Sequence, residues 1–304
     1  MATVESTPAV ARSESAATHT GPSLVGRLGS WQLVRPLSEG NFTRVYSARP
    51  AEGPPNQPAA YVMKVLRKEW WRDSRAIEMQ RREAWVGSKV SHPNLLPVLS
   101  ASVQEPPFYI VSPKLDGVTL AQIIVEGQSV PIPLALWIAR QTADGLAALF
   151  VGAGVIHGDI KPANIVVAPT GHTTVLDFGF VQTPAEASHW ATRPLAGTLA
   201  YIAPELLTST LAAGPRSDIY SLGVTLYETL TGHRPWETED PGELATLHRE
   251  AKPTDIRALR PDTPEPVADL VHSMLAKDPL RRPASASELA SRLVRLEIKS
   301  FALL

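Results

Sequence analysis

Cysteine is absent from the 304-residue sequence, which excludes disulfide bonds, thiolate-bound zinc and catalytic thiols. Neither charge sign is in excess, because 29 basic and 30 acidic residues leave a net charge of −1 and no general attraction to nucleic acid or anionic lipid. The longest apolar run, around 145–156, contains Gly152 and Gly154 and is too short to cross a bilayer. We therefore expect a cytoplasmic protein with no membrane insertion and no nucleic-acid partner.

The length exceeds that of a usual single compact core, so we expect either one two-lobed domain or two smaller domains. Residues 1–28 are rich in Ala, Ser, Thr and Pro and lack both an apolar face and the pattern of a signal peptide. They are predicted to form a flexible N-terminal tail. Residues 299–304 are predicted to be a short C-terminal tail.

Short runs typical of strands dominate the first third of the chain, and helical periodicity dominates the rest. Strands are predicted at 31–37, 44–48, 60–65 and 109–111, with one helix at 75–90 and a proline-rich hairpin loop at 51–59. After Gly117, apolar residues recur every three or four positions at 134–149, 218–230, 266–275 and 286–296. These patterns predict a small sheet-rich lobe, a large helical lobe and a ligand cleft between them.

The strongest chemical signal is the segment 157–164, HGDIKPAN, followed by the triplet DFG at 177–179. These residue types suit phosphoryl transfer, which requires the protein mainly to position reactants and stabilise charge. Asp159 would orient a substrate hydroxyl and accept its proton, while Lys161 would lie near the transferred phosphoryl oxygens. Asn164 and Asp177 would hold Mg²⁺ between phosphates through oxygen ligands.

With these motifs the sequence resembles the protein kinase family, in particular the bacterial Ser/Thr kinases that are similar to eukaryotic ones, over about residues 31–297. The resemblance implies an α+β, bilobal protein-kinase fold, with a small antiparallel β-sheet and one helix in the N-lobe and a mainly helical C-lobe. It places the kinase domain at 29–298, with the N-lobe at 29–112, the hinge at 113–117 and the C-lobe at 118–298. One two-lobed domain is therefore expected.

A lysine at the end of an apolar strand, Lys64 in YVMK, matches the family's Val-Ala-Ile-Lys pattern. Glu83 follows 19 residues later on the predicted helix, a spacing at which the family pairs the two charges so that the lysine holds the α and β phosphates. The resemblance also implies a nucleotide slot whose residues are Leu37, Gly40, Val45, Val62, Lys64, Pro113, Leu115 and Val166. Ser112 would be the small residue that controls access behind the adenine.

Three further residues match parts of the family that support the fold. Glu205 in the segment 197–205 would form a buried ion pair with Arg282. Asp218 would begin a helix that anchors the catalytic loop. The segment 197–205 also resembles the part of protein kinases that docks a peptide substrate, which small-molecule phosphotransferases generally lack.

Three positions depart from the family pattern. Only Gly40 remains of the three glycines in the phosphate loop, with Ser38 and Thr43 at the others, so weaker nucleotide binding is expected. Gly158 replaces the arginine before Asp159, so activity is expected not to depend strictly on phosphorylation at Thr183, Ser188, Thr192 or Thr198. Gly87 is expected to leave a gap beside the helix, so that Gly87→Leu would raise basal activity.

The predicted function is transfer of the ATP γ-phosphate, with Mg²⁺ or alternatively Mn²⁺, to Ser/Thr hydroxyls of a protein substrate or of the chain itself. The alternative is a pseudokinase, a weakly active or purely scaffolding nucleotide-binding module, which the altered phosphate loop and Gly87 favour. A metal hydrolase is excluded because the eight histidines form no His-x-x-x-His pair. No sensor domain is expected in the sequence, so the regulatory input is expected from an activating partner or a dimer, from the tail, or from a region outside this sequence.

Overall fold

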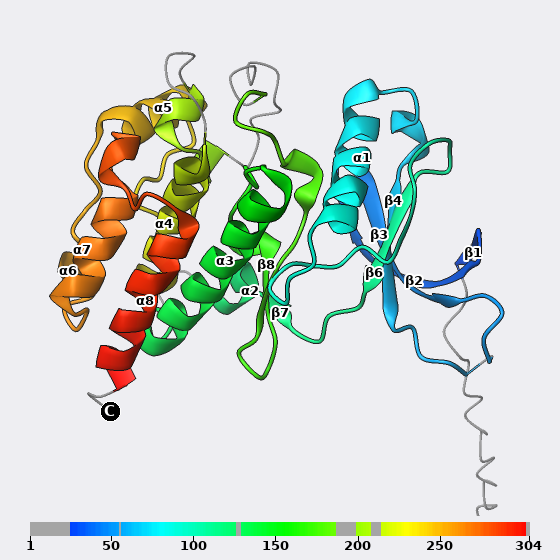
Figure 1. Ribbon diagram of the computed structural model, residues 1–304, viewed down its shortest axis with the longest axis horizontal. Helices are drawn as coiled ribbons and strands as arrows, with labels where there is room; N and C mark the ends of the chain where they lie inside the picture. The colour runs from blue at the N-terminus through cyan, green and yellow to red at the C-terminus, as the bar shows by residue number, and fades with distance from the viewer. Residues whose placement is uncertain (1–24, 55, 126–128, 187–198, 208–213, 302–304) are drawn as a thin grey trace, which may run out of the picture.

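Two lobes make up the computed structural model, which describes residues 25–54, 56–125, 129–186, 199–207 and 214–301. Figure 1 shows the strands β1–β6 and the helix α1 on one side, and the helices α3, α4, α7 and α8 on the other. The expected division into a sheet-rich N-lobe and a helical C-lobe is confirmed. The predicted sites at Ser188, Thr192 and Thr198 lie outside the described residues.

The N-lobe is built on a six-stranded antiparallel sheet with the strand order β1-β2-β3-β4-β6-β5. Its elements are β1 (Gly26–Leu28), β2 (Trp31–Glu39), β3 (Thr43–Pro50), β4 (Tyr61–Leu66), the 3-10 helix η1 (Lys68–Trp70), α1 (Ser74–Lys89), β5 (Ser100–Ser102) and β6 (Tyr109–Pro113). The register aligns Lys64 with Val45 on one side and with Ile110 on the other. The predicted loop 51–59 connects β3 to β4 as a hairpin.

Regular secondary structure extends further at both ends than the sequence predicted. β1 pairs with β2 through a two-residue turn at Gly29 and Ser30, so residues 26–28 belong to the sheet and not to a tail. A glycine followed by a small polar residue between two strands is a hairpin signal that the prediction missed. At the other end, α8 (Ala286–Phe301) continues three residues beyond the expected boundary at 298.

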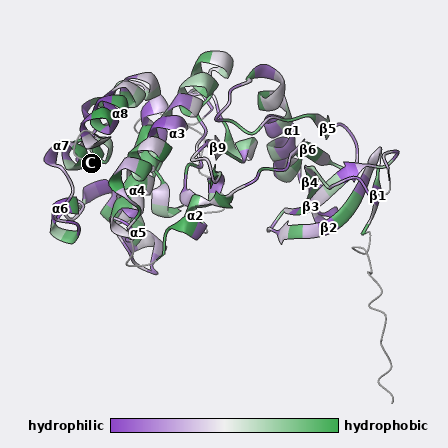
Figure 2. Ribbon diagram, turned by 90° about the horizontal axis from the view of Figure 1, so that it is seen from below, coloured by the Kyte–Doolittle hydropathy of each residue, from purple (hydrophilic) through white to green (hydrophobic). Residues whose placement is uncertain are grey.

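The C-lobe is organised around α4 (Pro215–Thr231), nearly all of whose side chains are buried. The remaining elements are β7 (Val118–Thr119), α2 (Leu120–Ile123), α3 (Ile132–Ala153), η2 (Pro162–Asn164), β8 (Ile165–Val167), β9 (Thr173–Val175), η3 (Phe178–Phe180), η5 (Leu199–Tyr201), η6 (Pro204–Leu207), α5 (Pro241–Glu250), α6 (Ile256–Leu259), α7 (Glu265–Met274) and η7 (Pro279–Arg281). β7, β8 and β9 form a second, three-stranded sheet beneath the cleft. Figure 2 shows hydrophobic and hydrophilic residues alternating along α3 and α8, as expected for helices that cover a core on one face.

α3 is the one helix of the described chain that is long and apolar enough to cross a membrane, with 22 residues. The sequence prediction considered only the run around 145–156 and missed this stretch. In the structure, 56% of its most apolar window is buried inside the protein, where it packs against α4 and α8. This burial is typical of the core helix of a folded lobe.

Gly87 does not leave a gap beside α1, so that prediction was wrong. A Cβ atom built at Gly87 would lie 2.3 Å from the Cβ of Val98 and 3.3 Å from its Cα. The side chain of Val98 therefore already occupies the space, and α1 lies too close to the following segment for any larger residue. Gly87→Leu is therefore not expected to raise activity, because a leucine would push α1 and Glu83 out of position.

Substitution of Gly87 by alanine is expected to destabilise the protein by about 1–3 kcal/mol, because overpacking against Val98 outweighs the better helix propensity of alanine. Urea denaturation followed by circular dichroism measures this change. Ser88→Ala, at the neighbouring exposed position on α1, is the matched control and should stay within about 0.5 kcal/mol of wild type. A Gly87→Ala variant as stable as wild type would contradict the close contact.

Candidate active site

The cleft between the lobes contains a cavity of about 480 Å³. All eight residues predicted for the nucleotide slot line it: Leu37, Gly40, Val45, Val62, Lys64, Pro113, Leu115 and Val166. Glu83, Asn164 and Asp177 line the same cavity, so it combines an apolar slot with a charged end. The structure thus brings these residues together from both lobes, and their individual roles stay predictions.

Lys64 connects three elements at the charged end of the cavity. Its Nζ donates hydrogen bonds of 2.8 Å both to Glu83 Oε2 on α1 and to Asp177 Oδ1 in front of η3. Burial alone would lower the pKa of Lys64, but the negative charges of Asp177 and Glu83 outweigh burial and raise the pKa above its ordinary value. The ammonium is therefore positively charged at neutral pH and able to attract phosphate oxygens.

Local structure explains why Glu83 reaches this lysine. Asp73 caps α1 by accepting a hydrogen bond from the amide of Ala76 at 2.8 Å, and one helix face buries Ala76, Gln80, Glu83 and Val86. The spacing of three and four residues turns Glu83 toward the cleft. Burial raises the pKa of Glu83 despite the opposing effect of the Lys64 charge, so the pair is needed to keep the carboxyl ionised.

Asp159 is 3% exposed, and its two carboxylate oxygens differ in their contacts. Its Oδ2 accepts hydrogen bonds from Asn164 Nδ2 and lies in an ion pair with Lys161 Nζ, both at 2.9 Å. Its Oδ1 is buried and has no partner among the described residues. A buried acceptor without a partner is costly, so Oδ1 is suited to receive a proton from a bound hydroxyl.

Backbone contacts hold the loop that carries Asp159, as predicted for Asp218. The Asp218 carboxylate accepts hydrogen bonds from the amides of His157 at 2.7 Å and Gly158 at 2.8 Å. Gly158 has a φ of +71°, a left-handed conformation that glycine adopts without the steric cost of a Cβ. The ring of His157 packs edge-on against Phe178 at 5.7 Å, which joins this loop to the segment after Asp177.

Asn164 and Asp177 suit a hard cation such as Mg²⁺. Mg²⁺ is usually bound through one or two protein oxygens together with substrate phosphates and water, and these two side chains face the same cavity. Asp177 has a φ of +64°, which is unusual for a residue other than glycine and is typical of functional positions. Among the described residues no group of three or more His, Cys, Asp and Glu side chains could hold a metal ion without a substrate.

The phosphate loop keeps a hairpin shape despite its missing glycines. Ser38, Gly40 and Thr43 line the cavity, and the Gly40 amide donates to the Thr43 carbonyl at 2.8 Å. Glu39 turns away from the cavity and forms ion pairs with Arg44 at 2.9 Å and Arg67 at 3.4 Å. Its carboxylate is therefore neutralised and does not repel anions inside the cavity.

An aromatic contact holds the tip of this loop. Phe42 packs edge-on against Trp70 with ring centroids 4.8 Å apart, and Trp70 Nε1 donates to the Asn41 carbonyl at 2.9 Å. The Arg67 amide also donates to the Phe42 carbonyl at 2.9 Å. This support was not predicted from the sequence, because the helix η1 was not expected.

Several further residues line the cavity that the sequence analysis did not name, among them Leu96, Ile110 and Leu176. Leu176 directly precedes Asp177, so its place in the cavity could have been predicted from the position of Asp177. Ile110 lies opposite Lys64 in the sheet, and this placement depends on the pairing of β4 with β6, which no local pattern reveals. Ser112 is buried and lines the cavity, in agreement with its predicted position.

Glu205 and Arg282 form the predicted buried ion pair. The guanidinium donates hydrogen bonds of 2.7 and 2.9 Å to the two carboxylate oxygens, and the two residues are 2% and 3% exposed. Ser217 adds a third hydrogen bond to Glu205 at 2.7 Å. The pair links η6 to the segment after η7 across α4.

Comparison with known proteins points in the same direction. The family model described as protein kinase domain matches residues 31–294. The chain is similar to the serine/threonine-protein kinase PrkC of Bacillus subtilis, with 29% identity over 261 residues, 86% of this chain and 39% of that protein. It is also similar to the serine/threonine-protein kinase PknB of Mycobacterium tuberculosis, with 35% identity over 244 residues, 77% of this chain and 38% of that protein. The chain thus spans about two fifths of these relatives.

Replacing Glu205 by glutamine is expected to lower the free energy of unfolding by about 3–5 kcal/mol, because it leaves the buried Arg282 charge without its counter-ion. Thermal or urea denaturation measures the loss. Glu250→Gln, which removes an equal charge from an exposed position on α5, should change stability by less than about 0.5 kcal/mol. Equal stability of the two variants would show that the buried pair contributes nothing net.

Proposed function

The chain belongs to the protein kinase domain family, and we propose that it is an active serine/threonine protein kinase. The observation that carries the proposal is the single ammonium of Lys64 held between Glu83 and Asp177, at 2.8 Å from each. This arrangement joins the N-lobe sheet, α1 and the start of η3 into one charged site. Within this site, Lys64 lines the cavity at a position from which it can bind a nucleotide phosphate.

The proposed chemistry divides among residues of both lobes. Lys64 binds the α and β phosphates of ATP, and Asp159 accepts the proton of the acceptor hydroxyl through its free Oδ1. The hydroxyl oxygen forms a bond to the γ-phosphorus while the bond from that phosphorus to the leaving ADP oxygen breaks. Lys161, 2.9 Å from Asp159 Oδ2, offsets the charge of the transferred phosphoryl group.

Asn164 and Asp177 are proposed to hold Mg²⁺, or alternatively Mn²⁺, with the substrate phosphates. The ion would neutralise phosphate charge during transfer. Asn164 is fixed for this task by hydrogen bonds from its Nδ2 to the Asp159 carbonyl at 2.8 Å and to Oδ2 at 2.9 Å. Because the amide nitrogen faces Asp159, the amide oxygen is the atom left to meet a cation.

The proposed acceptor is a serine or threonine hydroxyl of a protein. Support comes from Lys161 beside Asp159 and from the described residues 199–205, whose 3-10 turns pack on α4 and α5. Glu205 at the end of this segment is tied into the C-lobe core through Arg282. Such a rigid base suits a surface that positions a peptide.

The loss of two glycines from the phosphate loop favours one alternative, a nucleotide-binding scaffold without transfer activity. Against it stands the complete set of polar groups described above, which a scaffold has no need to keep in one geometry. Binding of nucleotide without phosphate transfer would distinguish the scaffold from the enzyme. The regulatory partner and the acceptor protein remain proposals, since the chain spans about two fifths of the relatives' length.

Asp159→Asn is expected to reduce phosphate incorporation from labelled ATP into a Ser/Thr protein substrate by at least about 100-fold, because the amide cannot accept the hydroxyl proton. Circular dichroism and nucleotide-binding titration should show an unchanged fold and an intact nucleotide site. Asp269→Asn, which removes the same charge from an exposed position on α7, is the control and should keep full activity. Wild-type protein that binds ATP and Mg²⁺ but transfers no phosphate would refute the proposal.

A further inference from the structure

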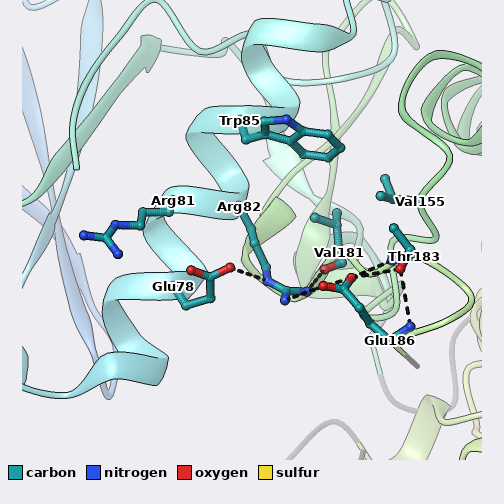
Figure 3. A pocket seen from close by; sticks show the side chains of 8 residues that line it. All are labelled: Glu78, Arg81, Arg82, Trp85, Val155, Val181, Thr183 and Glu186. Atoms are coloured by element: carbon teal, nitrogen blue, oxygen red, sulfur yellow. Dashed lines mark hydrogen bonds and ion pairs between the residues drawn. The ribbon is translucent and has the colours of Figure 1, made fainter. Parts of the chain in front are cut away.

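A groove lies on the outer side of α1, away from Lys64, and is drawn in Figure 3. One wall is α1, with Glu78, Arg82 and the exposed Trp85, and the other is the chain that follows η3, with Val181, Thr183 and Glu186. Figure 3 shows Arg82 reaching from the helix across the groove, while Arg81 turns the other way. Arg82 thus directly connects α1 to the segment after Asp177.

The guanidinium of Arg82 is engaged on every side. Its Nη1 donates to the Val181 carbonyl at 2.8 Å, its Nη2 donates to Glu186 Oε1 at 3.0 Å, and its Nε donates to Glu78 Oε1 at 3.1 Å. Glu78 belongs to α1 itself, whereas Val181 and Glu186 belong to the facing segment. The planar, five-donor guanidinium can satisfy these directions at once, which a lysine ammonium cannot.

Glu186 is held ready for this contact by its own turn. Its Oε2 accepts from the Thr183 amide at 2.9 Å and from the Thr183 hydroxyl at 3.1 Å, while its amide donates to that hydroxyl at 3.3 Å. The hydrogen bond from the Thr183 amide lowers the pKa of Glu186, burial opposes this effect, and the charge of Arg82 lowers the pKa further. The turn therefore holds the ionised carboxylate at the place where Arg82 Nη2 contacts it.

The position of Arg82 in the sequence connects its contact with Glu186 to the Lys64 site. Arg82 immediately precedes Glu83, so the same turn of α1 is bound on one side to Lys64 and on the other side to the segment after Asp177. Val181 directly follows η3, whose Phe178 packs against His157 of the catalytic loop. A shift of α1 away from the sheet would have to break both connections.

We infer that Arg82 and Glu186 are positioning residues that hold α1 in its active place without phosphorylation of the chain. The inference rests on the proposed kinase function. Gly158 offers no guanidinium beside Asp159 to bind a phosphorylated side chain, and the Glu186 carboxylate supplies a permanent negative charge for a cation on α1 instead. Arg82 acts through Glu83 and Lys64 and touches no substrate.

The solvent exposure of Arg82 and Glu186 determines how strongly their ion pair affects activity. The side chains of Arg82 and Glu186 are 26% and 48% exposed, so their ion pair is partly screened. Glu186→Gln is expected to lower kcat/KM for ATP about two- to fivefold. Arg82→Ala also loses the hydrogen bond to the Val181 carbonyl and is expected to lower kcat/KM for ATP about tenfold or more. KM for the protein substrate should stay unchanged in both variants.

A double-mutant cycle tests the coupling. The variant with both Arg82→Ala and Glu186→Gln should be no worse than Arg82→Ala alone, since the second change removes a partner that is already lost. Arg82→Lys should restore only part of the activity. Arg81→Ala, on the same helix but facing away, and Glu105→Gln, an exposed acid, are the matched controls and should behave as wild type.

Three results would overturn the inference. They are full additivity of the two losses, Glu186→Gln with unchanged activity, and wild-type protein that becomes inactive once phosphatase treatment has removed all phosphate as judged by intact mass. If wild type transfers no phosphate at all, the proposed function fails, and hydrogen–deuterium exchange then decides this inference separately. Faster exchange across α1 and residues 178–186 in Arg82→Ala, but not in Arg81→Ala, supports it, and equal exchange refutes it.

Discussion

One ammonium group lies at the centre of this molecule. Lys64 neutralises Glu83 from α1 and Asp177 from the C-lobe side of the cleft, and it offsets the burial that raises the pKa of Glu83. Because the three groups come from three separate elements, the pairing fixes the position of α1 relative to the sheet and to η3. Lys64, Glu83 and Asp177 all line the nucleotide slot, so their pairing sets the shape of its charged end.

The C-lobe uses the same principle in a different form. Asp218, at the start of the buried helix α4, binds two successive backbone amides of the catalytic loop, and Glu205 binds Arg282 through both oxygens. A carboxylate that satisfies buried donors in this way sets the backbone course without taking part in chemistry. Asp159 differs from both, because one of its oxygens is buried without a partner. The contrast separates acids that hold the fold from the acid that is available for a reaction.

Much of the fold and of the site could be predicted from the sequence, because short motifs carry its resemblance to the protein kinase family. The pairing of Lys64 with Glu83 and the closeness of Asp159 to Asn164 were expected from the resemblance of these motifs to the protein kinase family, and the structure brings both pairs together. Features that depend on contacts between distant segments were missed. Gly87 was misread because Val98, eleven positions on, fills the space beside it, and Ile110 was overlooked because strand pairing places it opposite Lys64. The support of Phe42 by Trp70 was equally invisible, since it joins two turns.

The contact between Phe42 and Trp70 also bears on how a glycine-poor phosphate loop can bind a ligand. A glycine-rich loop samples many backbone conformations when empty and loses that freedom on binding. Here the side chains at Ser38 and Thr43 narrow the accessible backbone states, and the ring of Trp70 fixes the tip of the hairpin. The loop is therefore largely ordered before anything enters the cavity, and the entropy lost on ordering it is correspondingly small. With fewer glycines, the backbone of the loop approaches a bound phosphate less closely, but the loop is better preorganised for binding.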